Sequence, residues 1–247
     1  MTTAKDLIVK PISSKDARRI VRKLHYSGKV VQNSVLHLGV FLNGNCEGVM
    51  QFGGSIDKRR MLPVVSGTKW NEILELNRMA FSDALPRNSE SRAISVAMRL
   101  IKKRYPQIKW VISFADGCQC GDGTIYRASG FQLIGIKKNS TLLMTESGEV
   151  VADKTFNNSI NKKYKGLSKS DCSPIVGHQL KYIYFIDKSY RERLTVPELP
   201  FSDIDKMGAG MYKGIKRVTK ANSSDQLESG GAIPTHTLQS AETYVRY

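Results

Sequence analysis

The chain has few cysteines and no long apolar run. Its 247 residues include four cysteines, Cys46, Cys118, Cys120 and Cys172, which are too scattered for a disulfide framework. The Cys118–Cys120 pair has no second pair and no nearby histidine, so the sequence assigns no metal ligands and predicts reduced thiols. No apolar stretch approaches the roughly 18 residues of a membrane helix, and the first residues lack a signal-peptide pattern. These absences predict a cytoplasmic protein.

Acidic residues are also scarce. There are 22 of them against 38 lysines and arginines, which gives a formal net charge of +16. The basic residues recur in nearly every segment, so a polyanion is the expected partner, with nucleic acid favoured over a merely soluble basic surface. We expect one domain over residues 1–195 and, because Gly, Ser, Thr and Lys dominate beyond it, a basic, largely extended tail over 196–247.

The hydrophobic pattern alternates between strand and helix periods. The 14–24 and 89–104 segments carry helical apolar stripes, and Asn43-Gly44-Asn45 joins the two strands of a hairpin. A glycine-rich turn from Asp116 leads into a short helix. Strands are expected over residues 6–12, 37–42, 46–52, 73–81, 110–115, 131–137 and 180–187, which indicates an α/β fold with a mixed central sheet flanked by helices.

Two turns at strand ends carry polar side chains where α/β proteins usually bind ligands. The first precedes the helix at 89, where free backbone N–H groups and the positive end of the helix dipole favour an anion; its residues are Arg87, Asn88, Ser91 and Arg92. The second begins at Asp116 and reaches Tyr126. A third cluster, His25-Tyr26-Ser27-Gly28-Lys29, follows the first helix. The loop residues Lys58, Arg59 and Arg60 either hold phosphates or form a solvated turn.

The order of elements fits the acyltransferase fold of the GNAT superfamily, but RNSESR stands where that superfamily has its Gln/Arg-x-x-Gly-x-Gly/Ala phosphate loop. This departure argues against ordinary coenzyme A binding. A closer resemblance rests on five blocks: HYSGK at 25–29, GVMQFG at 48–53, ELNRMAF at 75–81, LPRNSESR at 85–92 and SFADGCQCGDGTIYRASGF at 113–131. They resemble the Mom family of phage DNA-modification proteins, which is GNAT-like.

The resemblance implies conversion of adenine in double-stranded DNA to N6-carbamoylmethyladenine in the host bacterial cytoplasm, which protects phage DNA from restriction. It points to six positions: His25, Tyr26, Arg78, Ser91, Asp116 and Tyr126. From the chemistry of the reaction we expect Asp116 to accept or orient the amine proton, Tyr126 to protonate the leaving group, Arg78 and Ser91 to hold the donor, and His25 with Tyr26 to shape the base pocket. We add substrate-binding roles for Arg87, Asn88 and Arg92, and DNA contacts for Lys29, Lys58, Arg59 and Arg60. A flipped adenine also needs an aromatic partner, for which Tyr26, Trp70 and Phe52 are the candidates. For Phe52 and Trp70, a packing role in the core is the favoured alternative.

Acyl transfer gives an amide, whereas this product has a methylene on the amine. A glycyl group reconciles the two, because its amine can attack the adenine ring carbon and rearrange without a redox step. Glycyl-tRNA is therefore the favoured donor, with an acetyl-CoA-type donor as the alternative. A metal-dependent route, a non-catalytic basic DNA-binding protein and a conventional acetyltransferase remain the rival hypotheses, and a homodimer is possible.

Overall fold

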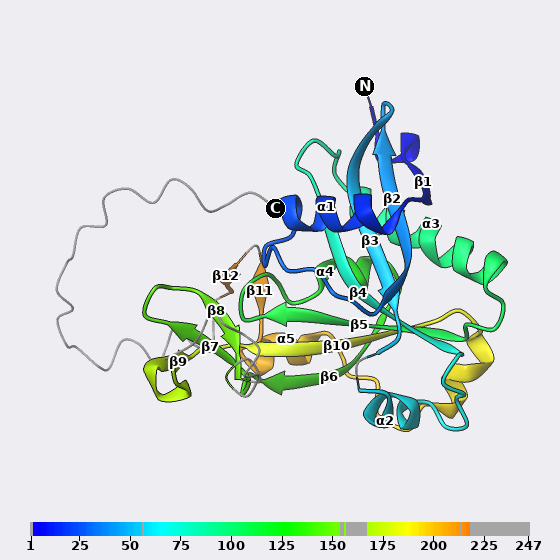
Figure 1. Cartoon of the computed structure of the whole chain (residues 1–247). Helices are drawn as coiled ribbons and strands as arrows, with labels where there is room; N and C mark the ends of the chain where they lie inside the picture. Colours follow the sequence, from blue (N-terminus) through cyan, green and yellow to red (C-terminus); the bar gives the residue numbers. More distant parts are fainter. Residues whose placement is uncertain (1, 56, 154–155, 157–166, 213, 218–247) are drawn as a thin grey trace.

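The computed structural model describes residues 2–55, 57–153, 156, 167–212 and 214–217. A seven-stranded sheet forms its centre, in the order β1-β2-β3-β4-β5-β10-β6 (Figure 1). Neighbouring strands are antiparallel except for β4 and β5, which are parallel. The strands are β1 (Ile8–Pro11), β2 (Ser34–Leu42), β3 (Asn45–Gly53), β4 (Ile73–Phe81), β5 (Trp110–Gly117), β6 (Gln132–Lys138) and β10 (His178–Phe185).

The predicted order of elements is present. The main helices are α1 (Ser14–Leu24), α3 (Ser89–Arg104) and the short α4 (Thr124–Ala128). Strand, helix, hairpin, strand, helix, strand, short helix, strand and late strand follow one another as expected, which confirms the α/β fold with a mixed central sheet flanked by helices. The smaller elements are η1 (Ala4–Asp6), α2 (Lys58–Met61), η2 (Leu62–Val64), β7 (Leu142–Thr145), β8 (Val150–Ala152), η5 (Lys169–Asp171), β9 (Cys172–Pro174), η6 (Lys188–Arg193), α5 (Ser202–Lys206), β11 (Met211–Tyr212) and β12 (Ile215–Lys216).

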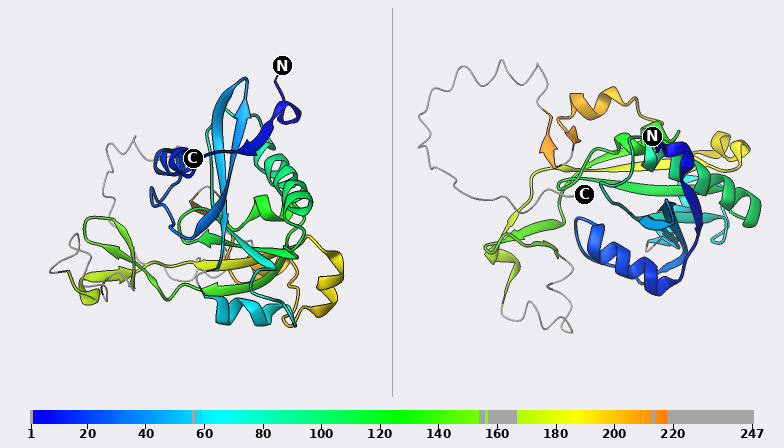
Figure 2. Two further views of the ribbon diagram at one scale, coloured as in Figure 1. Left: turned by 45° about the vertical axis from the view of Figure 1, so that its right-hand side comes forward. Right: turned by 90° about the horizontal axis from the view of Figure 1, so that it is seen from above.

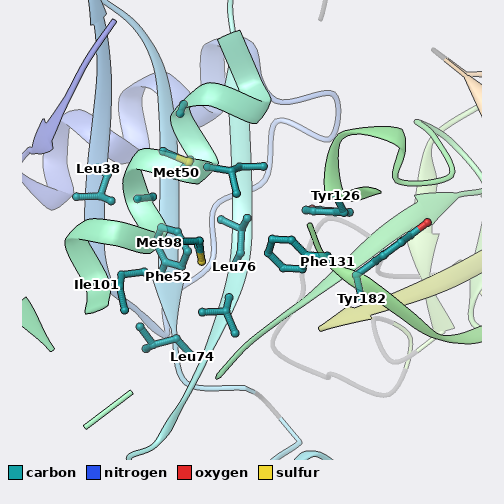
Figure 3. Packing of buried hydrophobic residues seen from close by; sticks show 14 of the residues in the cluster. Leu38, Met50, Phe52, Leu74, Leu76, Met98, Ile101, Tyr126, Phe131 and Tyr182 are labelled. Carbon is teal, nitrogen blue, oxygen red and sulfur yellow. The ribbon is translucent and has the colours of Figure 1, made fainter. Parts of the chain in front are cut away.

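The helices α1 and α3 cover opposite faces of the sheet (Figure 2). The apolar stripe of α1 packs on Val49 and Ala80. On the other face, Met98 and Ile101 of α3 pack against the strand residues that include Met50, and Tyr126 and Phe131 extend this core toward β10 (Figure 3). Each face of the sheet is therefore covered by a different helix, and the sheet lies between α1 and α3.

The parallel pair β4 and β5 stops pairing midway. Cα partners run only from Ile73 and Trp110 to Leu76 and Ser113, although β4 continues to Phe81 and β5 to Gly117. Past this point β4 still pairs with β3 and β5 still pairs with β10, but the two strands no longer pair with each other. The residues beyond Leu76 and Ser113 consequently lie where the strands separate, and they include Arg78 and Asp116.

The chain past residue 195 contributes to the folded part. Leu199 forms a bridge with Leu133 of β6, and Ile204 of α5 is buried in the main core. The boundary placed after residue 195 stays a prediction, and the tail from 218 onward lies outside the described residues. None of the helices in the described ranges combines the length and apolarity needed to cross a bilayer.

Candidate active site

The end of α1 meets the end of β5 through one hydrogen bond. The Tyr26 hydroxyl donates to Oδ2 of Asp116 over 3.0 Å, although the two residues are far apart in sequence. Gly28, with φ +60, occupies the left-handed region and lets the chain turn after the helix. Burial and the Asp116 carboxylate raise the pKa of Tyr26 above its ordinary value, so this phenol stays protonated and can only donate to the carboxylate.

His25 and Arg78 flank this contact. The His25 ring stacks on Tyr26 with centroids 4.4 Å apart, and its Nδ1 lies 2.9 Å from the Ser27 hydroxyl. Arg78 of β4 donates from Nε to the Lys29 carbonyl over 3.0 Å. Burial, and then the positive charge of Arg78, lower the pKa of His25 to about 4. The imidazole is therefore neutral at pH 7, and the local positive charge belongs to Arg78.

The neutral His25 makes stability depend on pH. Its pKa falls from 6.5 to about 4 on folding, so the unfolded chain binds more protons in this window and stability decreases as the pH drops through it. His37 and His178, whose pKa values burial also lowers, act in the same direction. Urea unfolding of a His25→Asn variant at several pH values is expected to give a flatter profile. An unchanged slope would contradict the placement of His25.

The Asp116 carboxylate is held by its own turn. Its Oδ1 accepts from the Cys118 backbone N–H over 3.0 Å, and its Oδ2 accepts from Nε2 of Gln119 over 2.7 Å. Burial and Asp116 raise the pKa of the Cys118 thiol to about 12 and that of the Cys120 thiol to about 11. Both thiols are thus protonated. Across the described residues, no group of three or more His, Cys, Asp or Glu side chains is arranged to hold a metal ion.

Tyr126 approaches the strand separation from the α3 side of the sheet. Its hydroxyl lies 2.8 Å from that of Ser113, which lies 3.0 Å from the Leu76 carbonyl. A carbonyl can only accept, so the arrangement that satisfies both contacts has Tyr126 donating to Ser113 and Ser113 donating to Leu76. Burial raises the pKa of Tyr126 to about 12. This phenol can serve as an acid but not as a base near neutral pH.

The predicted anion-binding residues lie apart from this group, on the face that α3 covers. Asn88 is the N-cap of α3 with φ +70, but its side chain makes no capping hydrogen bond. The backbone N–H groups of Glu90 and Ser91 donate to no backbone acceptor among the described residues. Asn88, Ser91 and Arg92, although not Arg87, line a cavity of about 400 Å³, whose other lining residues are Ala4, Lys5, Ser95, Ala128 and Ser129.

The residues predicted to contact DNA do not form one patch. Lys29 lies beside the site and donates from Nζ to the Val150 carbonyl over 3.1 Å. Lys58, Arg59 and Arg60 belong to α2, which precedes β4, whereas Arg78 lies in the second half of that strand. In Figure 1, α2 lies at the bottom of the view and α1, which Tyr26 follows, lies in the upper half. The roles of these residues stay predictions.

Of the three aromatic candidates for a flipped base, only Tyr26 lies at this site. Phe52 is 0% exposed in the core, which confirms its alternative packing role. Trp70 is 65% exposed, so the core role considered for it is wrong; Lys58 Nζ lies 4.4 Å from its ring centroid.

Sequence patterns did not identify Glu75, Gln119 or Ser113. Glu75 opens the ELNRM block and interrupts an apolar strand, a signal that was available. Its half-buried carboxyl has a pKa raised by burial, and Arg78 is close enough to lower that pKa. Gln119 and Ser113 contact Asp116 and Tyr126 through side chains that no spacing rule distinguishes from ordinary turn and strand residues.

A buried carboxylate fixes the turn that carries Asp116. Asp122 is 1% exposed. The next residue, Gly123, has φ +85 and lies against the Tyr182 ring. A Cβ at this position would lie 2.4 Å from a ring carbon, so only glycine fits. The Asp122 carboxylate receives the Arg217 guanidinium at 2.5 Å, Thr124 Oγ1 at 3.0 Å, the Met211 N–H at 3.3 Å and the Arg127 guanidinium at 3.5 Å. Met211 and Arg217 therefore hold the glycine turn in place from the C-terminal side of the chain.

This geometry can be set beside known proteins. Solved structures similar to the chain include the ribosomal-protein-S18-alanine N-acetyltransferase of Escherichia coli, with 12% identity, a TM-score of 0.42 and coverage of 73% of this chain and 94% of that one. Another is the spermidine/spermine N-acetyltransferase SpeG of Vibrio cholerae, with 8% identity, a TM-score of 0.45 and coverage of 77% and 99%.

Sequence comparison is more specific. A curated relative, the methylcarbamoylase mom of Escherichia phage Mu, is 39% identical over 197 residues, which are 78% of this chain and 80% of the relative. The model of the Mom protein family matches residues 6–203. That range contains all five blocks and every side chain described at the strand separation, so the resemblance read from the sequence is confirmed, and the chain belongs to the Mom protein family.

Proposed function

We propose that the protein is a phage DNA-modifying transferase that converts adenine in double-stranded DNA to N6-carbamoylmethyladenine and so protects the DNA from restriction. Membership of the Mom family and the methylcarbamoylase name of the phage Mu relative support the reaction class. The observation that carries the proposal is the Tyr26–Asp116 hydrogen bond beside Arg78, at the point where β4 and β5 separate.

The acceptor base enters on the α1 face. Tyr26, stacked on His25, offers an aromatic surface on which a flipped adenine can pack, and it is 39% exposed. The exocyclic amine replaces the Tyr26 hydroxyl as hydrogen-bond donor to Asp116, which then accepts its proton as the amine attacks. The net charge of +16 favours binding of the DNA backbone around this point.

The donor lies on the α3 face. The cavity beside the N-terminus of α3 combines two cations, Lys5 and Arg92, with the hydroxyls of Ser91, Ser95 and Ser129. That composition suits phosphate and ribose groups, such as those at the 3′ end of a tRNA. The reactive carbonyl extends from this cavity to the strand separation, where Arg78 polarises it and Tyr126 protonates the leaving oxygen.

The favoured donor is glycyl-tRNA. The amine of adenine attacks the glycyl carbonyl carbon, the ester bond to the tRNA breaks, and the product is N6-glycyladenine. The glycyl amine then attacks C6 to give a five-membered spiro ring, and the C6–N6 bond breaks. The former N6 becomes the carboxamide nitrogen, so carbamoylmethyladenine forms as an isomer of the first product with no oxidant.

Purified protein incubated with DNA and either labelled glycyl-tRNA or labelled acetyl-CoA tests the donor. Label is expected in DNA only with glycyl-tRNA, and mass spectrometry of the nucleosides is expected to give the mass of carbamoylmethyladenine. Label entering DNA only from acetyl-CoA would replace the glycyl route with conventional acetyl transfer. DNA binding with no label from either donor would favour a non-catalytic DNA-binding protein.

A further inference from the structure

Glu75 is a half-buried carboxylate just before the strand separation, in the last part of β4 that still pairs with β5, and the route above does not use it. It pairs with Gly53 of β3 and Ile112 of β5, and its neighbours Leu74 and Leu76 are buried in the main core. The Ser55 hydroxyl, on a residue only 7% exposed, hydrogen-bonds the carboxyl. A carboxylate in this setting lacks the water that would stabilise its charge, so it needs a cationic partner.

Arg78 is the nearby cation, but it is directed elsewhere. Its Nε and Nη1 donate to the carbonyls of Lys29 and Asn77 over 3.0 and 2.6 Å, and no hydrogen bond is recorded for Nη2 within the described residues. No ion pair joins Arg78 to Glu75 in the described part of the chain, although each influences the titration of the other. Two partly buried, opposite charges thus lie near each other without contact.

Tyr126 reaches the same part of the sheet from the α3 side. Its hydroxyl lies 2.8 Å from that of Ser113, the last residue of β5 that pairs with β4, and Ser113 in turn contacts the carbonyl of Leu76, the residue after Glu75. An acid, a cation and a carboxylate therefore surround the place where the strands separate. A ligand that fits all three carries a leaving oxygen, a carbonyl oxygen and an ammonium group within a few bonds of one another. An aminoacyl ester has these groups, whereas an acetyl ester lacks the ammonium.

We propose that Glu75 binds the α-ammonium of an aminoacyl donor and later accepts its proton. This inference rests on the proposed function, because it identifies what distinguishes a glycyl from a simple acyl donor in the same site. While the ester is intact, the carboxylate pairs with the ammonium and Arg78 holds the carbonyl oxygen. After transfer, the ammonium gives one proton to Glu75, and the free amine attacks C6. When the C6–N6 bond breaks, Glu75 returns this proton to the departing N6, and the attacking nitrogen releases its second proton to solvent.

The test compares two donors that differ only at the amine, glycyl-tRNA and N-acetylglycyl-tRNA, with the full-length wild type and a Glu75→Gln variant. The wild type is expected to prefer glycyl-tRNA. Glu75→Gln is expected to reduce that preference by at least about tenfold, because a charge-assisted hydrogen bond is lost, while its rate with N-acetylglycyl-tRNA stays within about threefold. It is also expected to accumulate N6-glycyladenine, which chromatography separates from its isomer.

Glu72→Gln is the matched control, because Glu72 lies just before β4 and contacts Lys69 and Tyr190. It should retain the wild-type preference. Equal loss with both donors in Glu75→Gln would mean a structural role and overturn the inference while the proposed function stands. A wild type that uses neither donor, or only N-acetylglycyl-tRNA, would overturn the glycyl route together with it.

Discussion

Replacing Asp116 with asparagine is expected to lower the rate of adenine modification by about 10³-fold, within the range that a lost proton acceptor causes. The amide has nearly the shape of the carboxylate, and its oxygen can still accept the hydrogen bond from Tyr26. It cannot, however, take a proton from the attacking amine. The measurement is the fraction of modified adenine over time, from mass spectrometry of DNA nucleosides.

The control for Asp116→Asn is Asp16→Asn, which removes the same charge. Asp16 lies in the first turn of α1, at the opposite end of that helix from Tyr26, and pairs with Arg19 near the surface. Both variants should remain folded and bind DNA with wild-type affinity. Asp116→Asn is expected to unfold at a somewhat lower denaturant concentration, because its amide nitrogen cannot accept a hydrogen bond from a donor that the carboxylate oxygen at that position accepts from. If the modification rate of Asp116→Asn stays within about threefold of wild type, Asp116 is not the proton acceptor.

Replacing Asp122 with alanine is expected to lower the free energy of unfolding by about 3 kcal/mol, because the change leaves groups around a buried ion pair without their partner. The carboxylate is 1% exposed and receives the Arg217 guanidinium and the Met211 backbone N–H from the C-terminal segment of residues 209–212 and 214–217. Its loss frees that segment from the turn that carries Asp116. Activity is therefore expected to fall further than the folded fraction does.

A double-mutant cycle with Arg217→Met isolates the pair. Because the two side chains are in contact at 2.5 Å, the effects of the single variants should not add, and we expect a coupling energy of about 1–2 kcal/mol. Asp203→Ala serves as control, since its pairing with Lys206 lies near the surface and should matter by no more than about 0.5 kcal/mol. Additive single effects would show that the segment is held by other contacts.

The regular elements of the central sheet were predictable because their patterns are strong. The strand Ile73–Phe81 and the helices Ser14–Leu24 and Ser89–Arg104 were placed almost to the residue. Asn43 and Gly44, both at positive φ, make the hairpin turn that the Asn-Gly pair predicts. In these segments, local propensity and burial favour the same structure.

The C-terminal region was harder to predict. Its composition is polar and glycine-rich, yet Ile204, Ala209 and Met211 are buried. What holds this segment is the Asp122 carboxylate, more than 80 residues upstream, and composition cannot reveal a partner so distant. The sequence also predicts a loop at residues 58–60, which in the structure belong to α2. Met61, the buried residue of that helix, packs on Val64 and Ile73 in a separate small core, and the local sequence does not reveal this tertiary contact.

At the candidate site, the sequence indicated which turns carry the functional side chains, but it did not indicate which of these side chains contact one another. Tyr26 and Asp116 touch because α1 ends over the last residues of β5, a fact of tertiary packing. Glu75 and Arg78 share one face although they are three residues apart, because the register shifts between β3 and β4 near Asn77. Strict alternation would have placed them on opposite faces.

The early end of β4–β5 pairing has a kinetic consequence. The cavity proposed for the donor lies on the α3 face and the Tyr26–Asp116 contact on the α1 face. Under this proposal the sheet lies between the two substrates except where β4 and β5 separate. Neither substrate has to leave for the other to arrive. Double-reciprocal plots of initial rate against donor concentration, at several fixed DNA concentrations, should therefore intersect, as for a ternary complex. Saturating DNA should not raise the apparent KM for the donor, because DNA does not compete for the donor site.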